Sequence, residues 1–339
     1  MSYRRILVGT DGSETAVRAE DAARRIASAF EAELTIAHAL EKPEKGPDPA
    51  VERAAEVARA EGLEVITAVP KGRPAEALVE LADRRSADMV VVGNVGMTGA
   101  RRFLGSVPAS VSHMAPCDVL IVRTVSPYGP ARGAYRRAVV ATDGSPTADR
   151  AARKGVTFAR GMGAEITLVY VGHEVTGRNV LEDTARQLGG DGLDLLVVGG
   201  EPVRGILGAA RDVEAELVVV GSRGLTGSHL ESIGAIPNKV AHKALTDVMI
   251  AKTYLLGYDD VKPGEAAIVS NEGKKLAVYK DENGAEYVLS ARCKHMGCTV
   301  NWNGGEKTWD CPCHGSRYNF DGKVIQGPAQ KDLDPAGRP

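Results

Sequence analysis

The stretch ILVGTDGSETAVRAEDAARRIA at residues 6–27 recurs as VVATDGSPTADRAARKGVTFAR at residues 139–160. A second stretch, DMVVVGNVGMTGARRFLGSVPASVSHMAPCDVLIVRT at 88–124, recurs as ELVVVGSRGLTGSHLESIGAIPNKVAHKALTDVMIAKT at 216–253. Each copy spans roughly 120 residues, which is a typical size for one domain. Residues 1–254 are therefore an internal repeat, and a different C-terminal part follows them.

Short apolar segments alternate within each copy with segments that are rich in Ala, Glu and Arg and have the period of a helix. In the first copy this pattern predicts strands over 4–9, 33–39, 63–69, 88–92 and 118–122. It predicts helices between them, near 14–30, 50–61, 73–86 and 103–115. Strands that are apolar throughout and separated by helices are typical of a parallel sheet covered on both faces. We therefore expect an α/β fold.

Two motifs recur at equivalent places in the copies. An Asp follows the first strand, as Asp11 and Asp143, and a glycine-rich loop follows the fourth strand and leads into a helix. These motifs resemble the universal stress protein family over both halves of 1–254. The resemblance implies two tandem Rossmann-like domains, each with five parallel strands, and it implies binding of ATP or another adenine nucleotide.

The family's loop has the pattern G-x2-G-x9-G-(S/T). Glycines let backbone N–H groups approach phosphates, and the start of the following helix adds a partial positive charge. The first copy matches with Gly93, Gly96, Gly105 and Ser106, although its spacer has eight residues instead of nine. A glycine-rich loop can absorb a deletion of one residue, so we expect nucleotide binding in this copy.

The second copy has the full spacing, with Gly221, Gly224 and Gly234, but Ala235 replaces the hydroxyl residue. This replacement removes one phosphate hydrogen bond, worth about 1 kcal/mol or somewhat more. Binding and loss of binding are therefore both open for the second copy.

The resemblance implies that Asp11 and Asp143 contact the nucleoside. A turn-forming Asp-Gly pair after a strand is the alternative interpretation. No GxxxxGK(S/T) motif occurs in the chain, so fast ATP hydrolysis is not expected.

A second signal lies near the C-terminus, where four of the five cysteines are interleaved with two histidines. These residues are Cys293, His295, Cys298, Cys311, Cys313 and His314. Thiolate and imidazole side chains at this density are typical ligands of a borderline-soft metal. The spacing is compatible with a structural zinc site or with a [2Fe-2S] cluster that has two histidines on one iron. A four-coordinate zinc ion gives no role to the two additional cysteines.

The segments CKHMGC at 293–298 and CPCHGSRY at 311–318 resemble the two cluster-binding loops of Rieske iron–sulfur proteins. The resemblance implies that Cys293 and Cys311 hold one iron, and that His295 and His314 hold the other. Neutral imidazoles in place of two thiolates make the cluster less negative. The potential is therefore expected to lie above that of an all-cysteine ferredoxin.

Further residues of these loops have implied roles. Cys298 and Cys313 would form a disulfide between the loops, and Ser316 and Tyr318 would raise the potential through hydrogen bonds to sulfur. Ordinary turn and strand surface is the alternative for Ser316 and Tyr318. The chain stops at Pro339, where many Rieske domains continue into a closing strand. We therefore expect an abbreviated barrel, or one completed by another part of the molecule.

The sequence predicts three domains, over 1–127, 132–254 and 258–339. The third is expected to be small and all-β, because β-favouring residues alternate with turn signals around the ligand loops. In the stress-protein family the fifth strand is an exposed edge that commonly pairs with the same strand of a second copy, as unpaired edges invite. Segments 117–124 and 246–253 can form this pair within one chain as an internal pseudo-dimer. Whole chains can associate further into a homo-oligomer.

Composition describes a soluble globular protein, with 43% hydrophobic residues and 42 basic against 44 acidic side chains. No basic segment is suited to nucleic acid, and no apolar run approaches the ~20 residues of a membrane helix. A strand predicted beside Met1 leaves no room for a signal peptide, which favours the cytoplasm. A disulfide would be unusual in that compartment.

These features favour an electron-transfer or redox-sensing protein with a Rieske [2Fe-2S] module, bound adenine nucleotide and a redox partner protein. The alternative is a nucleotide-binding stress regulator that acts by binding partners and whose cluster is only structural. A Rieske oxygenase would require a mononuclear iron site, and residues 1–254 lack its spacing. We predict no catalytic residues, and the one enzymatic role compatible with the motifs is the electron-transfer component of an oxidoreductase.

Overall fold

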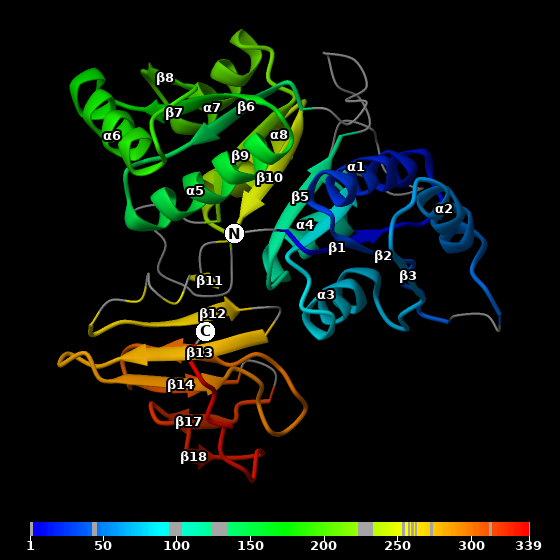
Figure 1. Cartoon of the computed structure of the whole chain (residues 1–339), viewed down its shortest axis with the longest axis vertical. Helices are drawn as coiled ribbons and strands as arrows, with labels where there is room; N and C mark the ends of the chain where they lie inside the picture. Colours follow the sequence, from blue (N-terminus) through cyan, green and yellow to red (C-terminus); the bar gives the residue numbers. More distant parts are fainter. Residues whose placement is uncertain are drawn as a thin grey trace. The chain divides into compact units, whose positions relative to one another are not determined.

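A computed structural model describes most of the chain in two compact units. The described residues are 3–42, 46–94, 104–123, 135–222, 233–252, 255–256, 258, 261, 263–271, 274–311 and 314–338. The first unit comprises Met1–Thr253 and the second comprises Tyr254–Pro339 (Figure 1). None of the helices in these described parts is long and apolar enough to cross a membrane.

The first unit consists of two halves with the same order of elements. The first half contains β1 (Arg5–Gly9), α1 (Glu14–Phe30), β2 (Glu33–Ala37), α2 (Pro49–Ala60), β3 (Val65–Ala68), α3 (Pro74–Arg84), β4 (Met89–Gly93), α4 (Ser106–Met114) and β5 (Asp118–Val122). The second half contains β6 (Arg137–Ala141), α5 (Pro146–Gly161), β7 (Glu165–Val171), α6 (Glu174–Gln187), β8 (Leu193–Val198), α7 (Pro202–Asp212), β9 (Leu217–Gly221), α8 (Ala235–Lys243) and β10 (Asp247–Ala251). The α/β fold with five strands in each copy is confirmed.

All ten strands of the first unit form one sheet, in the order β3-β2-β1-β4-β5-β10-β9-β6-β7-β8. Strands within each half are parallel, whereas β5 and β10 pair antiparallel, with Leu120 opposite Met249. The predicted pairing of the two fifth strands is therefore confirmed. One core lies between the sheet and α1, α2, α5 and α6, and a second core lies against α3, α4, α7 and α8.

Buried carboxylates hold the two halves together at the ends of this central strand pair. Asp118 accepts a hydrogen bond from the backbone N–H of Lys252 at 2.7 Å, and Asp247 accepts one from the backbone N–H of Arg123, also at 2.7 Å. Each carboxylate thus binds the backbone of the opposite half. The Tyr3 hydroxyl donates a further bond to Asp118 at 2.8 Å. Unpaired charges at these buried places would be costly, so the hydrogen bonds fix the strand register.

An aromatic cluster joins the halves on the face covered by α1 and α5. Phe30 and Phe158 stack with ring centroids 5.8 Å apart, and Tyr3 meets each of them edge-on. Phe30 lies directly over Gly161, where a Cβ atom would be 2.4 Å from the ring Cζ. The close approach of the Phe30 ring to α5 therefore favours glycine at 161.

The second unit contains two four-stranded sheets, one mixed and one antiparallel. One is formed by β11 (Leu255–Leu256), β12 (Ala266–Asn271), β13 (Lys274–Lys280) and β14 (Glu286–Ser290), with β11 parallel to β12. The other is formed by β15 (Asn301–Asn303), β16 (Thr308–Asp310), β17 (Arg317–Asn319) and β18 (Val324–Gln326). Their shared core is centred on the buried rings of Trp309 and Tyr318. The expected all-β C-terminal part is confirmed.

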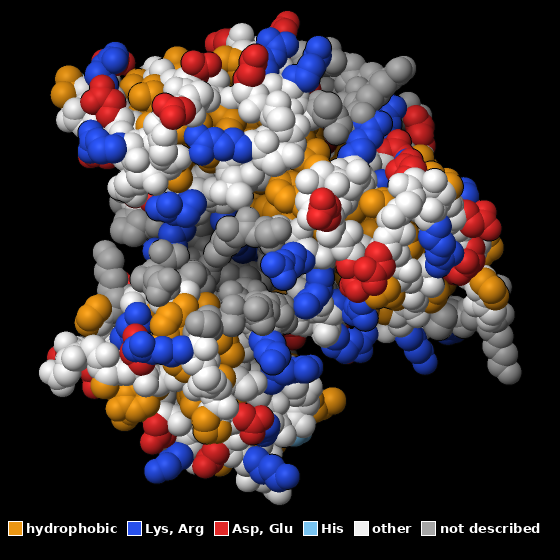
Figure 2. All heavy atoms as spheres, in the orientation of Figure 1, with side chains coloured by type: hydrophobic (Ala, Val, Ile, Leu, Met, Phe, Trp, Pro, Cys, Tyr) orange, Lys and Arg blue, Asp and Glu red, His pale blue; other side chains and the backbone are white. Residues whose placement is uncertain are grey.

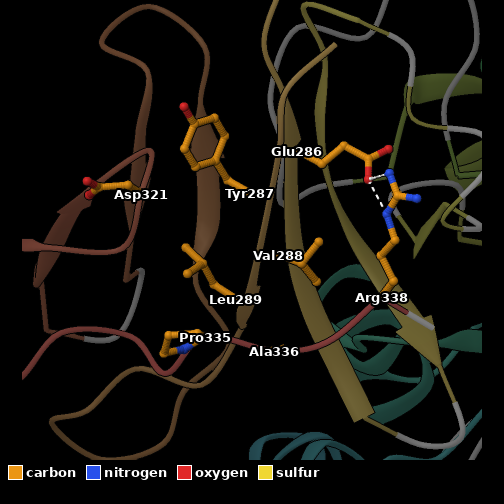
Figure 3. A pocket seen from close by; sticks show the side chains of 8 residues that line it. All are labelled: Glu286, Tyr287, Val288, Leu289, Asp321, Pro335, Ala336 and Arg338. Atoms are coloured by element: carbon orange, nitrogen blue, oxygen red, sulfur yellow. Dashed lines mark hydrogen bonds and ion pairs between the residues drawn. The ribbon is translucent and has the colours of Figure 1, made fainter.

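The C-terminal segment of the second unit lies along the edge of β14. Asp334 and Ala336 exchange backbone hydrogen bonds with Ser290 and Val288, at 2.8 and 2.9 Å. Figure 3 shows this segment beside a shallow groove, with the Arg338 side chain turned toward Glu286. The chain's own last residues therefore supply strand-like pairing beyond β18, in a part of the fold where we expected an abbreviated barrel.

Acidic and basic side chains are interspersed on the visible face of the molecule (Figure 2). This agrees with the net charge of −2 from 42 basic and 44 acidic residues. Many of these charges form short-range pairs along helices, such as Arg84 with Glu80 and Arg178 with Glu174. Such exposed pairs contribute little to stability.

The contact between Phe30 and Gly161 generates a first prediction. We expect Gly161→Ala to lower the free energy of unfolding of the first unit by about 1–3 kcal/mol, because the new methyl group must displace a stacked ring. Urea unfolding followed by circular dichroism at 222 nm measures this, since the helices of the described residues all lie in the first unit.

Gly208→Ala is the matched control, because the nearest atom to its new Cβ is 3.9 Å away. This helical substitution should stabilise the unit by about 0.5–1 kcal/mol. In a Phe30→Ala background, Gly161→Ala should also become neutral or stabilising. Equal effects of Gly161→Ala in both backgrounds would contradict the proposed contact.

Candidate functional site

The two Cys/His segments of the second unit fold into loops with the same backbone pattern. In the first, the Cys293 N–H donates to the carbonyl of Cys298 at 2.8 Å, and its carbonyl accepts from Gly297 at 2.9 Å. In the second, Cys311 makes the equivalent bonds to the residues five and four positions ahead, at 2.7 and 3.0 Å. Gly297 and Gly315 have φ values of 80° and 72°, a conformation that glycine adopts without strain. This explains the C-x-x-x-G spacing shared by both loops.

The loops bring the predicted ligands together in two like pairs. Cys293 and Cys311 are not disulfide-bonded, each is 3% exposed, and they are hydrogen-bonded to one another. His295 and His314 are exposed, and their rings meet edge-on with centroids 4.7 Å apart. Buried sulfur therefore lies on one side of the site and imidazole lies on its surface.

Tyr318 anchors the buried side of the site. Its hydroxyl oxygen lies 3.2 Å from Cys293 Sγ and accepts a hydrogen bond from the Lys294 N–H at 3.0 Å. The hydroxyl hydrogen is therefore available to the sulfur. Burial and the bond to Cys293 raise the pKa of Tyr318, so it remains a donor across the physiological range.

Ser316 makes the second polar contact to Cys293 and is fully buried. Its Oγ accepts a hydrogen bond from the Ala329 N–H at 3.0 Å, which ties the Gly327–Ala329 segment to the second loop. Burial alone would raise the pKa of the Cys293 thiol, but hydrogen bonds from Tyr318, the His295 backbone, Cys311 and Ser316 outweigh it and lower this pKa. A thiol that is easily deprotonated is suited to binding a metal.

These residues fit a binuclear cluster. A [2Fe-2S] centre of mixed ligation needs two thiolates on one iron and two imidazoles on the other. The observed segregation into a buried thiol pair and an exposed imidazole pair provides this donor set. Within the described residues, no three His, Cys, Asp or Glu side chains are arranged around one metal ion.

The remaining cysteines are accounted for in part. Cys298 is disulfide-bonded, whereas Cys117 is buried in the first unit and is not disulfide-bonded. Cys313 lies outside the described residues, so its pairing with Cys298 stays a prediction.

The two predicted aspartates of the first unit follow the carboxyl ends of β1 and β6. Asp11 and Asp143 each use Oδ1 to accept a backbone hydrogen bond two residues ahead, at 3.0 Å, from Ser13 and Ser145. Both serines then cap the next helix. The turn-forming interpretation of the two aspartates is thus confirmed, and contact with a nucleoside remains a prediction.

The first glycine loop begins beside α1 and ends at α4. A Cβ at Gly93 would lie 2.9 Å from the Thr15 carbonyl oxygen, so the close approach of strand and helix requires glycine. The Gly105 N–H donates to the Asn94 carbonyl at 2.7 Å, and Ser106 opens α4. Among the described residues, no side chain makes a cap hydrogen bond at its N-cap Gly105, and its first turn contains no acidic residue, so its N-terminus is suited to an anion. Gly96 lies outside the described residues.

The described ends of the second loop match those of the first. Gly221 ends β9, and the Gly234 N–H donates to the Ser222 carbonyl at 2.8 Å at the start of α8. Within the described part of the chain, α8 also lacks a side-chain cap hydrogen bond at its N-cap Gly234 and an acidic residue in its first turn. Gly224 lies outside the described residues.

Two cations beside these helices were not predicted from the sequence. Lys252 Nζ donates to the Ser112 carbonyl in the last turn of α4 at 2.7 Å, and the Arg123 guanidinium donates to the Ala241 carbonyl in α8. The signal was present in the repeat, because a basic residue follows the fifth strand in both copies, in VRT at 122–124 and AKT at 251–253. His38 Nδ1 lies 2.9 Å from Asp48 Oδ2, a contact between side chains ten residues apart that the repeat pattern does not predict.

Known proteins match the two units separately. The Universal stress protein family matches residues 2–59, 47–123, 134–179 and 172–252, and the Rieske [2Fe-2S] domain matches residues 252–336. A universal stress protein of Archaeoglobus fulgidus DSM 4304 has the same fold, with a TM-score of 0.58 and 20% identity, over 75% of this chain and 100% of that chain.

Two sequence relatives each match one of these two kinds of domain. The Rieske 2Fe-2S iron-sulfur protein YhfW of Bacillus subtilis (strain 168) is 45% identical over 76 residues, which cover 22% of this chain and only 15% of that protein. Universal stress protein Rv1636 of Mycobacterium tuberculosis (strain ATCC 25618 / H37Rv) is 40% identical over 149 residues, covering 36% of this chain and 98% of that protein.

The family matches take in most of the chain, and the repeated fold and the paired ligand loops agree with them. The chain belongs to the universal stress protein family, as two tandem domains of that family followed by a C-terminal Rieske [2Fe-2S] domain.

Proposed function

We propose that this chain is an electron-transfer or redox-sensing protein that holds a [2Fe-2S] cluster in its second unit and binds an adenine nucleotide in its first unit. Cys293 and Cys311 would bind one iron, and His295 and His314 the other. The observation that carries this proposal is the separation of the four side chains into a buried thiol pair and an exposed imidazole pair.

Each pair has its own part in this function. A cluster of this type supplies one-electron transfer when bound. The buried thiols keep their side of the site away from water. The exposed imidazoles form the surface that a redox partner protein would contact, because electrons cross short distances without a substrate pocket.

The hydroxyl groups beside the thiols adjust the reduction potential of the proposed cluster. Tyr318 donates toward Cys293 Sγ while the Lys294 N–H holds its oxygen in place. The Ala329 N–H donates a hydrogen bond to Ser316 Oγ and so fixes the serine side chain. Hydrogen bonds to ligand sulfur stabilise the more negative, reduced state and so raise the potential.

Nucleotide binding in the first unit is supported by the loop geometry. In both halves an uncapped helix without acidic residues in its first turn follows a glycine at the end of the fourth strand. Backbone N–H groups and the helix dipole would then meet the phosphates. The carboxyl edge of such a sheet is also where ligands bind in open α/β folds.

Removal of the Tyr318 hydroxyl gives the most direct test of the cluster's surroundings. We expect Tyr318→Phe to lower the reduction potential by roughly 50–100 mV, because a hydrogen bond to charged sulfur is worth about 1.5–3 kcal/mol and part of it is lost on oxidation. Potentiometric titration of the full chain, followed by the visible spectrum, measures the shift.

Tyr287→Phe is the control, since this tyrosine stacks on Tyr279 in the same unit and lines the groove beside β14 instead of the thiols. Its potential should equal that of the parent protein. A Tyr318→Phe protein with an unshifted potential would remove the role assigned to this hydroxyl.

Substitution of the helix-capping glycines tests the nucleotide site. Gly105→Asp places a good N-cap residue with a negative charge at the start of α4, so it should keep the helix and repel phosphate. We expect ATP binding in the first half to weaken at least tenfold, by ~1.4 kcal/mol or more, in isothermal titration of the full chain. Gly234→Asp makes the same test in the second half.

Gly208→Asp adds the same charge at an open position of α7 and should leave ATP binding unchanged. Equal binding by all of these proteins would contradict the glycine loops as phosphate sites.

The same titration with oxidised and reduced protein separates a redox sensor from a regulator with a structural cluster. Unequal affinities support redox sensing, and equal affinities favour a regulator whose cluster is structural.

A further inference from the structure

A buried lysine crosses from one half of the first unit to the other. Lys252, just beyond β10, is 2% exposed. Its Nζ donates to the carbonyl oxygens of Ser112 at 2.7 Å and His113 at 3.4 Å. Both carbonyls belong to the last turn of α4 in the first half, so the cation lies at the negative end of that helix.

The sequence of α4 creates the need for this donor. In a continuing helix the Ser112 carbonyl would accept from the N–H of the residue four positions ahead. That residue is Pro116, which has no N–H. A buried carbonyl without a partner is costly, and Lys252 supplies the missing hydrogen bond together with a positive charge.

Helix α8 of the second half is bound in the same way by a cation of the first half. Arg123, just beyond β5 in the first half, is buried and donates to the Ala241 carbonyl in α8 of the second half. Burial lowers the pKa of Arg123 to about 10, so it is still a cation at neutral pH. The backbones of Arg123 and Lys252 are themselves fixed by Asp247 and Asp118.

The two helices that receive these cations are those that follow the glycine loops. Gly105 is the N-cap of α4 and Gly234 is the N-cap of α8, and each helix has nine residues. A helix of this length is about 13 Å long and moves as one rigid body. Its phosphate-facing end is therefore positioned by whatever holds its carboxyl end.

We propose that Lys252 and Arg123 are positioning residues for nucleotide binding, each acting on the glycine-loop helix of the opposite half. This inference rests on the proposed binding of a nucleotide by the first unit. Lys252 fixes the position and favours the dipole of α4, and Arg123 does the same for α8. Each phosphate site thus depends on a side chain that follows the last strand of the other domain.

The test uses the full chain with Gly234→Asp, so that ATP binding reports the first half alone. In this background we expect Lys252→Met to raise the Kd for ATP roughly three- to tenfold in isothermal titration. Lys252→Arg should restore binding, because arginine occupies the equivalent position in the other half. If Lys252→Met does not retain the parent circular dichroism, Lys252→Gln replaces it, since it keeps a donor and removes the charge.

Arg24→Met is the control. Arg24 is a partly buried cation of α1 whose guanidinium donates to Asp21 and Glu61, so its hydrogen bonds go neither to Lys252 nor to the two glycine-loop helices. A purely structural role predicts lower stability and equal Kd values for both substitutions. Positioning predicts a raised Kd for Lys252→Met only.

The outcomes distinguish failure of the positioning role from failure of nucleotide binding itself. Tight ATP binding by the parent with an unchanged Kd in Lys252→Met, or with equal changes in Lys252→Met and Arg24→Met, overturns the positioning role and leaves nucleotide binding intact. Absence of ATP binding by the parent overturns both. In the reciprocal experiment, Arg123→Met in the Gly105→Asp background should weaken binding in the second half.

Discussion

The second unit depends on one constraint, which is that two loops distant in sequence present like side chains to each other. Cys293 and Cys311 meet in the core, and His295 and His314 meet at the surface. Equivalent backbone hydrogen bonds shape the two loops. The buried residues Trp309 and Tyr318 belong to the same core cluster as the two cysteines. Two facing thiols, of which Cys293 has a lowered pKa, would be a liability without a metal, because thiolates are prone to oxidation. Their retention inside the core is explained by a cluster that needs thiolate on one side and imidazole on the other.

The first unit is organised by the antiparallel pairing of β5 and β10. Each half would otherwise expose a strand edge, and pairing the two edges removes both. The strand ends carry side chains that exchange across the junction. Carboxylates bind the backbone of the opposite half, and cations bind the ends of the opposite helices. A tandem repeat within one chain thus becomes a single ten-stranded body in which α4 and α8 are each bound by a cation of the opposite half.

The sequence predicted the parts that local pattern determines. Period and repeat placed every strand of the first half within two residues of its observed ends, and the ligand loops followed from spacing and resemblance. Contacts between distant residues were not predictable. The bond from Lys252 to Ser112 spans 140 residues, and the pairing of the C-terminal segment with β14 depends on where the chain returns. Asp11 illustrates a middle case, because a single motif served equally for a turn or a ligand contact, and the structure shows the turn.

The central claim is that four side chains of the second unit bind a binuclear iron–sulfur cluster. Its most direct test is the analysis of iron, zinc and acid-labile sulfide in the full chain purified without oxygen. We predict two irons and two sulfides per chain and no stoichiometric zinc. A protein loaded with one zinc ion and lacking labile sulfide would contradict this account.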